Sequence, residues 1–278
     1  MTVQFWFFYA VLAARYVFMA GVAFLVFYIL FPRQFASRKI QPAAPRRHDY
    51  GREVGFSFFT FVVFAGYGIL LSSDAVRPYT HIYTDLSAHS WGYFALSVVL
   101  ALVLHDTYFY WTHRLMHHPK LFRLFHLTHH KSVNPSPWAA FSISPLEAVV
   151  EGGIIFVVAF LLPIHPLAIV VFLFFMTVYN VYGHLGYEIY PAWLVNSGVG
   201  KWLNTSTNHN MHHKYFKGNY GLYLRCWDEW MGTTHRKYHQ TLARLVNGPQ
   251  EPNAALPKIV ARFFGRQQFP AAQGWLLG

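Results

Sequence analysis

Histidines are the residues of this sequence whose type and spacing could do chemistry. The chain of 278 residues contains 17 of them, and most fall in three short groups. In the first, HDTYFYWTHRLMHH, His113 and His117 are four residues apart and share one face of a helix. The second and third, FHLTHH and NHNMHH, have the form His-x-x-His-His, which also turns imidazoles toward a shared centre. The predicted metal ligands in these groups are His113, His117, His118, His126, His129, His130, His209, His212 and His213.

The number of imidazoles predicts two metal ions. A single catalytic zinc needs three protein ligands and an open position, whereas the two triplets and the His113/His117 pair already supply eight nitrogens. Imidazoles suit iron, zinc, copper or nickel, so the ligand type leaves the metal open. Iron is favoured by the apolar setting, because oxidation of a lipid C–H bond requires a redox metal and O2. We therefore predict two iron ions, with no catalytic residue separate from their ligands.

Other residues near these groups are candidates for the same centre. His184, in YGHLGYE at the end of an apolar segment, is a further predicted ligand. Ligating imidazoles usually donate their second ring N–H to a carboxylate or a carbonyl group. We expect supporting contacts of this kind from His105, Asp106 and Asp228, and consider three more carboxylates, Glu147, Glu188 and Glu229.

The elements that must position these histidines are membrane helices. The chain is 54% hydrophobic and 12% charged, about half the charged share of a soluble domain. A spanning helix needs roughly 20 predominantly apolar residues. Three such runs cover residues 5–30, 54–71 and 91–111, and a fourth apolar stretch at 149–182 is broken at Pro163 and Pro166, which predicts a helical hairpin. We predict an all-α integral membrane protein with four to five spanning helices.

The basic residues predict the orientation of these helices. The loop after the first span carries six arginines and lysines, whereas the loop after the second carries only Arg77. By the positive-inside rule the first loop is cytoplasmic, and counting the crossings brings every histidine group to that side. We therefore expect one membrane domain, residues 1–278, with a cytoplasmic, histidine-rich helical cap that holds the metal site, and with its catalytic region at 101–237. Residues 255–266 have the pattern of a helix lying on the membrane surface.

Charge and cysteine content exclude other classes of protein. The net charge of +11 comes from cations in loops that flank apolar spans, which fits anionic lipid headgroups rather than nucleic acid. A single cysteine excludes an internal disulfide and any site built from several cysteines. A bacterial inner membrane and an endoplasmic reticulum both fit the basic loops.

At the histidine groups the sequence resembles the fatty acid hydroxylase and sterol desaturase superfamily. The family pattern is His-x3-4-His followed by two copies of His-x2-3-His-His, and the likeness extends over residues 101–237 through NPSPWAAFSISPLEA and NYGLYLRCWDEWMGT. The segments PSPWAA and GHLG, around His184, are most similar to the sterol C5-desaturase branch. The sequence departs from that branch at Ser144-Pro145, where the branch usually has His-Pro.

The resemblance implies a membrane di-iron centre that takes electrons from a cytochrome b5- or ferredoxin-type donor and uses O2 to oxidise a lipid. Either a hydroxylated product or an alkene can result, and the substrate, the donor and the oligomeric state stay open. Two other classes compete with this interpretation. A zinc-dependent lipid hydrolase or amidase would use about three of the histidines, and an electron-transfer protein with bis-His haems would place histidines inside its apolar helices.

Overall fold

The computed structural model describes residues 1–248, so the surface helix expected at 255–266 lies outside the described part of the chain. Within residues 1–248 every regular element is helical, as predicted. The longer helices are α1 (Thr2–Phe24), which continues as a π-helix to Leu30, α2 (Arg47–Ser72), α3 (Trp91–Met116) and α8 (Pro166–Gly183). The shorter ones are α4 (Pro119–Phe125), α5 (Leu127–His130), α6 (Pro145–Gly152), α7 (Ile154–Leu161), α9 (Ala192–Val195), α10 (Ser206–Tyr215), α11 (Cys226–Trp230) and α12 (Tyr238–Asn247).

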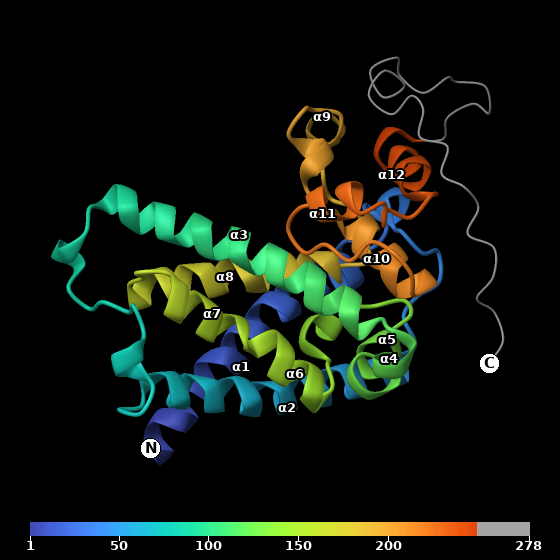
Figure 1. The fold of residues 1–278 in the computed structure, drawn as a ribbon. Helices are drawn as coiled ribbons and strands as arrows, with labels where there is room; N and C mark the ends of the chain where they lie inside the picture. Colours follow the sequence, from blue (N-terminus) through green and yellow to red (C-terminus); the bar gives the residue numbers. More distant parts are fainter. Residues whose placement is uncertain (249–278) are drawn as a thin grey trace.

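Four helices of the described chain are long and apolar enough to cross a membrane. They are Thr2–Leu30, Arg47–Ser72, Trp91–Met116 and Pro166–Gly183, and they run side by side through the bundle (Figure 1). Large apolar side chains such as Trp6, Phe18 and Val170 are exposed on their outer faces. Such a surface suits lipid rather than water, and the three spans predicted in the first half of the chain are confirmed.

The first limb of the predicted hairpin at 149–182 is divided into two short helices, and within the described residues only its second limb, α8, is a single helix long enough to span a membrane. The two short helices are α6 and α7, which meet at Gly152 and Gly153. A Cβ atom at Gly152 would lie 2.9 Å from the Tyr67 ring, and one at Gly153 would lie 2.9 Å from the Tyr108 hydroxyl. The two glycines therefore let Tyr67 of α2 and Tyr108 of α3 pack closely against the junction between α6 and α7. At 1.5 Å per residue, neither eight-residue helix reaches across a hydrocarbon core of about 30 Å.

Two of the apolar clusters within residues 1–248 join the long helices. One joins α3, α7 and α8 through Ala101, Val158 and Phe172, all fully buried. The other surrounds Tyr16 of α1, whose hydroxyl donates to the carbonyl oxygen of Trp138 at 2.8 Å. These contacts fix the short 3-10 helix Pro137–Phe141 between α1, α2 and α8, directly after the second histidine group.

Glu53 on α2 fixes the start of that segment. Its carboxylate is fully buried and accepts hydrogen bonds from the hydroxyls of Ser132 at 2.7 Å and Ser136 at 2.6 Å. Arg52 donates to the Ser132 hydroxyl as well, at 2.7 Å. The loop that follows α5 is thus tied to a spanning helix, which holds the second histidine group at the end of the bundle.

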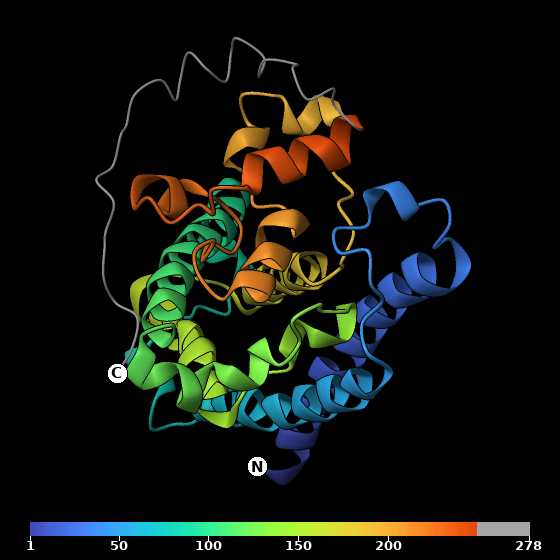
Figure 2. The same ribbon diagram turned by 90° about the vertical axis from the view of Figure 1, so that its right-hand side faces the viewer.

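The short helices α4, α5, α9, α10, α11 and α12 form a cap at the end of the bundle where α3 and α8 finish (Figure 1). Figure 2 looks onto this end, with α10 in orange at the centre between α8 in yellow and the green segment of α4 and α5. The chain leaves the cap at α6 and returns to it at Gly183. All three histidine groups therefore meet at one end, as the count of crossings predicts.

Candidate metal centre

Nine histidines from five helices or helix ends form two clusters. Within each cluster the ring nitrogens that could bind a metal all lie within 4.8 Å of one another. We call them the five-histidine and the four-histidine cluster. The five-histidine cluster contains His113, His117, His126, His130 and His212, and the four-histidine cluster contains His129, His184, His209 and His213.

The two His-His pairs divide between the clusters. On α5, His130 belongs to the five-histidine cluster and His129 to the other, and on α10 His212 and His213 separate in the same way. Neighbouring residues of an α-helix point about 100° apart because one turn takes 3.6 residues. Each pair of adjacent histidines therefore supplies one imidazole to each cluster, an arrangement that suits two neighbouring metal sites rather than one.

The Nε2 atoms point inward in both clusters. The Nε2 atoms of His117, His130 and His212 are 3.0–3.1 Å from one another. In the four-histidine cluster, the Nε2 atom of His184 lies 3.0 Å from that of His209 and 3.2 Å from that of His213. Each centre is therefore surrounded by nitrogens at close range.

The outer Nδ1 atoms show which nitrogen carries the proton. Four of them lie beside backbone carbonyl oxygens: His113 with Tyr220 at 3.0 Å, His129 with Ser142 at 3.3 Å, His184 with Asn180 at 2.7 Å and His212 with Gly218 at 2.7 Å. A carbonyl oxygen only accepts, so each Nδ1 must donate, and in a neutral ring Nε2 then holds a lone pair. These lone pairs converge, and a bound cation would turn their mutual repulsion into coordination.

Burial keeps the imidazoles neutral. It lowers the pKa of His184 to about 4, and together with the neighbouring His113 it lowers the pKa of His117 to about 2. The pKa values of His129 and His213 are also well below the usual value, first because of burial and then because of nearby imidazoles. A metal binds only the neutral ring, so these sites are prepared for coordination at neutral pH.

Glu147 is the carboxylate that contacts a clustered histidine directly. The Nδ1 atom of His126 donates to the Glu147 carboxylate, and both side chains are buried. Ser144 caps α6 by accepting from the Glu147 N–H at 3.1 Å, and its hydroxyl donates to the Phe125 carbonyl oxygen at 2.6 Å. Ser144, where this sequence differs from the usual His-Pro of the sterol C5-desaturase branch, thus connects α6 to the residue just before His126.

Asp228 supports the five-histidine cluster through a loop. Its carboxylate accepts from the N–H groups of Tyr220 at 2.9 Å and Gly221 at 2.8 Å, and the Tyr220 carbonyl oxygen accepts from His113. Asp106 accepts from the N–H group of Tyr223 at 2.7 Å, farther along the same loop. Both carboxylates therefore hold the loop in place, and neither contacts an imidazole of the clusters.

Two predicted candidates and two carboxylates lie outside the clusters. His118 is exposed, and its ring accepts from the Lys120 N–H at 3.4 Å at the start of α4. His105 is buried two turns before His113, with its Nδ1 atom 2.9 Å from the Tyr223 hydroxyl. Glu188 accepts from Thr207 at the start of α10, and Glu229 pairs with Arg225. The carbonyl acceptors were not predicted, because nothing in a sequence marks a backbone partner. Glu53 was not predicted either, because its serine partners are about 80 residues away in the chain.

An apolar cavity of about 530 Å³ lies among α1, α2, α3, α6, α7 and α8. Its lining includes Phe109, whose ring is 4.9 Å from that of His113, and Asn180, whose carbonyl oxygen accepts from His184. The lining also includes partly exposed residues of α1 and α8, among them Val11 at 48% and Val170 at 61% exposed. The cavity therefore extends from the membrane face of the bundle to the residues that carry the histidines.

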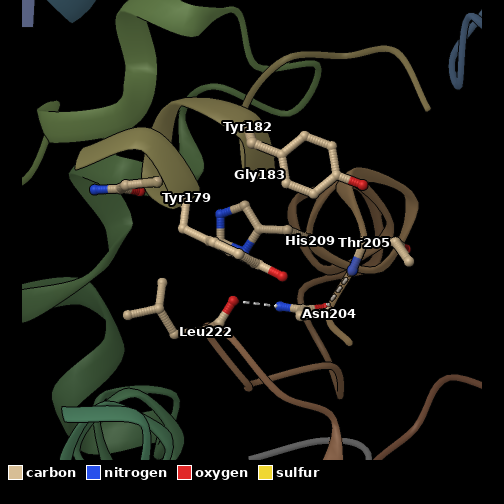
Figure 3. Close-up of a pocket in the computed structure, with 8 residues that line it drawn as sticks. Tyr179, Tyr182, Gly183, Asn204, Thr205, His209 and Leu222 are labelled. Carbon is tan, nitrogen blue, oxygen red and sulfur yellow. Dashed lines mark hydrogen bonds between the residues drawn. The ribbon is translucent and has the colours of Figure 1, made fainter. Parts of the chain in front are cut away.

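A second, smaller space lies beside the four-histidine cluster (Figure 3). It measures about 10 Å³, room for one water molecule. Its wall contains His209 and Asn204, whose amide donates to the Leu222 carbonyl oxygen at 3.0 Å. Asn180 and Leu222 line both this space and the large cavity, so the inner end of the cavity is one layer of side chains from His209.

Comparison with known proteins agrees with this geometry. The sequence profile of the fatty acid hydroxylase family matches residues 98–233. The Delta(7)-sterol 5(6)-desaturase ERG3B of Gibberella zeae is 29% identical over 226 residues, which cover 80% of this chain and 66% of that protein. Delta(7)-sterol 5(6)-desaturase erg3A of Aspergillus fumigatus is 32% identical over 61% of this chain and 46% of its own length. Human lathosterol oxidase is 27% identical over 55% of this chain and 50% of its own length.

The chain thus spans between about half and two thirds of the length of these relatives. No solved structure matches it. The family match contains all nine clustered histidines, and the relatives carry the names of sterol desaturases. The predicted resemblance is confirmed: residues 98–233, about half of the chain, match the fatty acid hydroxylase family, and the relatives to which the chain is similar are named as sterol desaturases.

Proposed function

We propose that this protein is a membrane-bound, O2-dependent hydroxylase or desaturase that attacks an unactivated C–H bond of a sterol or fatty-acyl lipid. The observation that carries the proposal is the convergence of Nε2 atoms in two adjacent clusters, one layer of side chains from the inner end of an apolar cavity. Two clusters of neutral imidazoles suit two iron ions. The sterol desaturase relatives support the lipid substrate.

In this proposal the two clusters hold one iron each. The five-histidine cluster binds the first, and the four-histidine cluster, including His184, binds the second. His118 is left out of the ligand set because its ring is exposed and caps α4. When bound, the two irons would supply the activation of O2 and the oxidising power for C–H cleavage.

The residues around this centre orient the imidazoles and shape the substrate site. The carbonyl oxygens of Asn180 and Gly218 and the carboxylate of Glu147 fix the ring orientations of His184, His212 and His126. Such partners also make the ligands more basic. The apolar lining of the cavity excludes water and aligns the hydrocarbon part of the substrate along the spanning helices.

The reaction requires an external source of electrons. Hydroxylation consumes one O2, two electrons and two protons per C–H bond and releases one water, whereas desaturation uses the same inputs and releases two waters. The described residues hold no disulfide or cysteine pair that could store electrons. We propose a cytochrome b5- or ferredoxin-type protein as the donor.

The same proposal covers sidedness and domain limits. The basic loop between α1 and α2 lies at the histidine end of the bundle, so the positive-inside rule puts the centre on the cytoplasmic side. The protein would act as one membrane domain in a bacterial inner membrane or an endoplasmic reticulum, with residues 101–237 as its catalytic region.

Metal analysis of purified protein tests the proposal. Elemental analysis with Mössbauer spectroscopy should find close to two irons per chain in the wild type, and a loss in His129→Ala. The exposed His118→Ala is the matched control and should keep both irons. One zinc per chain, with no iron bound after anaerobic loading, would replace the oxygenase with a zinc hydrolase. A product screen with sterols and acyl lipids, O2 and dithionite then identifies the substrate.

A further inference from the structure

An exposed aromatic side chain lies directly on one of the clustered histidines. The ring of Phe216, directly after α10, is 38% exposed, and its centroid is 4.8 Å from that of His130 at an angle of 33°. The Phe122 ring completes the group, at 6.1 Å from Phe216 and 5.5 Å from His130. His130 is itself buried. Phe216 therefore connects the protein surface to the five-histidine cluster through a single ring contact.

The backbone of Phe216 is strained. It has φ +62° and ψ +4°, in the left-handed region, and its N–H donates to the His212 carbonyl oxygen at 2.8 Å. Glycine is the usual residue at such a helix end, and a bulky side chain with positive φ is an outlier. Strain of this kind gathers at functional sites. The phenylalanine thus occupies a position where a smaller residue would fold more easily.

Five exposed cations lie within two residues of this aromatic group in the sequence. In the sequence, Lys214 precedes Phe216 by two residues and Lys217 follows it directly. Lys131 follows His130, Lys120 precedes Phe122 by two residues, and Arg123 follows Phe122. Residues 107–146 and 189–227 contain no aspartate or glutamate. We call Lys120, Arg123, Lys131, Lys214 and Lys217 the basic rim. Its charge makes this surface complementary to an acidic partner.

We propose that the basic rim is the docking site of an acidic, one-electron carrier protein, and that Phe216 is the point where its electrons enter the five-histidine cluster. This inference rests on the proposed function, which consumes two electrons per O2. The carrier is oxidised in two successive one-electron steps, and the electrons pass to the metal centre through the Phe216–His130 contact. Protons come from solvent, and no bond of Phe216 forms or breaks.

An anionic lipid headgroup is the alternative occupant of the rim. Lysines alone can bind a lipid phosphate. Phosphate binding does not explain why the exposed Phe216 ring packs against the buried His130 imidazole. The strained Phe216 backbone and its contact with His130 therefore favour the electron carrier, and the experiment separates the two.

The test uses the iron-loaded full chain in nanodiscs, with the soluble domain of a cytochrome b5 as the probe. Association is measured by surface plasmon resonance, and oxidation of the reduced probe is followed by stopped-flow absorbance. Lys214→Glu/Lys217→Glu should lower the association rate about 10-fold or more at low ionic strength, with the effect shrinking as salt is raised. Arg33→Glu/Arg244→Glu, which changes the net charge equally at exposed sites outside the rim, should leave it unchanged.

Phe216→Leu separates docking from electron entry. It should bind the probe as the wild type does and keep its iron, yet oxidise the bound probe about 10-fold more slowly. Equal oxidation rates for Phe216→Leu and the wild type would overturn the entry point. Unchanged association in the lysine variant, or a defect only in binding to phosphatidylserine vesicles, would overturn the docking site.

Chemical reduction separates this inference from the proposed function. With dithionite in place of the probe, both variants should form product at the wild-type rate. If the wild type forms no product with dithionite, the proposed function fails. If dithionite supports turnover and the probe reacts equally with wild type and variants, only the docking site and entry point fail.

Discussion

The Glu147 carboxylate accepts a hydrogen bond from Nδ1 of His126, which makes His126 the one histidine of the nine clustered in residues 1–248 whose ring pairs with an acid. Both groups are buried, and α6 carries the acid while the histidine lies between α4 and α5. The contact therefore couples the five-histidine cluster to α6, one of the helices that line the apolar cavity.

Replacing this acid should weaken metal binding. Glu147→Ala removes the acceptor of His126, and the loss of such a partner typically lowers metal affinity about 10- to 100-fold. Glu147→Gln keeps an acceptor oxygen and should lose less. The measurement is the rate of iron loss to a chelator, followed by absorbance. Equal rates for the alanine variant and the wild type would show that Glu147 has no part in orienting the ligand.

Asp228 should matter for both stability and metal content. Asp228→Ala leaves the buried N–H groups of Tyr220 and Gly221 without their acceptor, which costs about 2 kcal/mol or more. The loop that accepts from His113 then moves, so iron should be lost as well. Thermal unfolding in detergent and elemental analysis check the two effects. Asp74→Ala, at an exposed position, is the control and should change neither.

Filling the cavity should block turnover without affecting the iron. Leu173 lines the cavity on α8, whereas Val178 on the same helix is 40% exposed and does not line it. Leu173→Trp should lower kcat/KM at least about 10-fold, while Val178→Trp should leave it close to the wild-type value. Both should keep two irons. Normal turnover in Leu173→Trp would place the substrate elsewhere.

The metal-free protein should be sensitive to mild acid. Burial lowers the pKa of His184 from its ordinary value of 6.5, which applies to the unfolded chain, to about 4 in the folded chain. Below pH 6.5 the unfolded chain therefore binds more protons than the folded one. Stability is therefore complete above about pH 6.5 and falls as the pH approaches 4. A shift of this size is worth about 3 kcal/mol for one histidine.

The thermal unfolding midpoint of the metal-free protein, measured from pH 8 to pH 5, checks this expectation. The midpoint should fall steadily below about pH 6.5. Iron-loaded protein should resist until the metal is released, because bound imidazoles do not take up protons. A midpoint that rises toward acid pH would contradict the burial of neutral histidines.

Spacing alone predicted that the histidines meet, because His-x-x-His-His places its rings on one side of a helix. It did not predict that His129 and His130 serve different clusters, since that depends on which helices pack on either side of α5. The clustering of His184 was predicted from its position after an apolar segment. The exposure of His118 was not, because only the turn between α3 and α4 decides where its ring points.

The number of spanning helices shows the same limit. Apolar runs predicted α1, α2, α3 and α8, since length and hydropathy are properties of a segment by itself. The division of the hairpin's first limb depends on Gly152 and Gly153 packing against Tyr67 and Tyr108, and contacts between distant segments cannot be read from periodicity. The same holds for the carbonyl oxygens that orient the imidazoles.

The lining of the cavity by Val11 of α1 and Val170 of α8, both exposed at the surface of spanning helices, has a kinetic consequence. A lipid that enters between these helices arrives by lateral diffusion and never crosses water. The concentration that sets its rate is then its mole fraction in the bilayer. Diluting the substrate with inert phospholipid at constant total substrate should slow turnover, whereas diluting the whole suspension of reconstituted vesicles with buffer should leave turnover per protein unchanged.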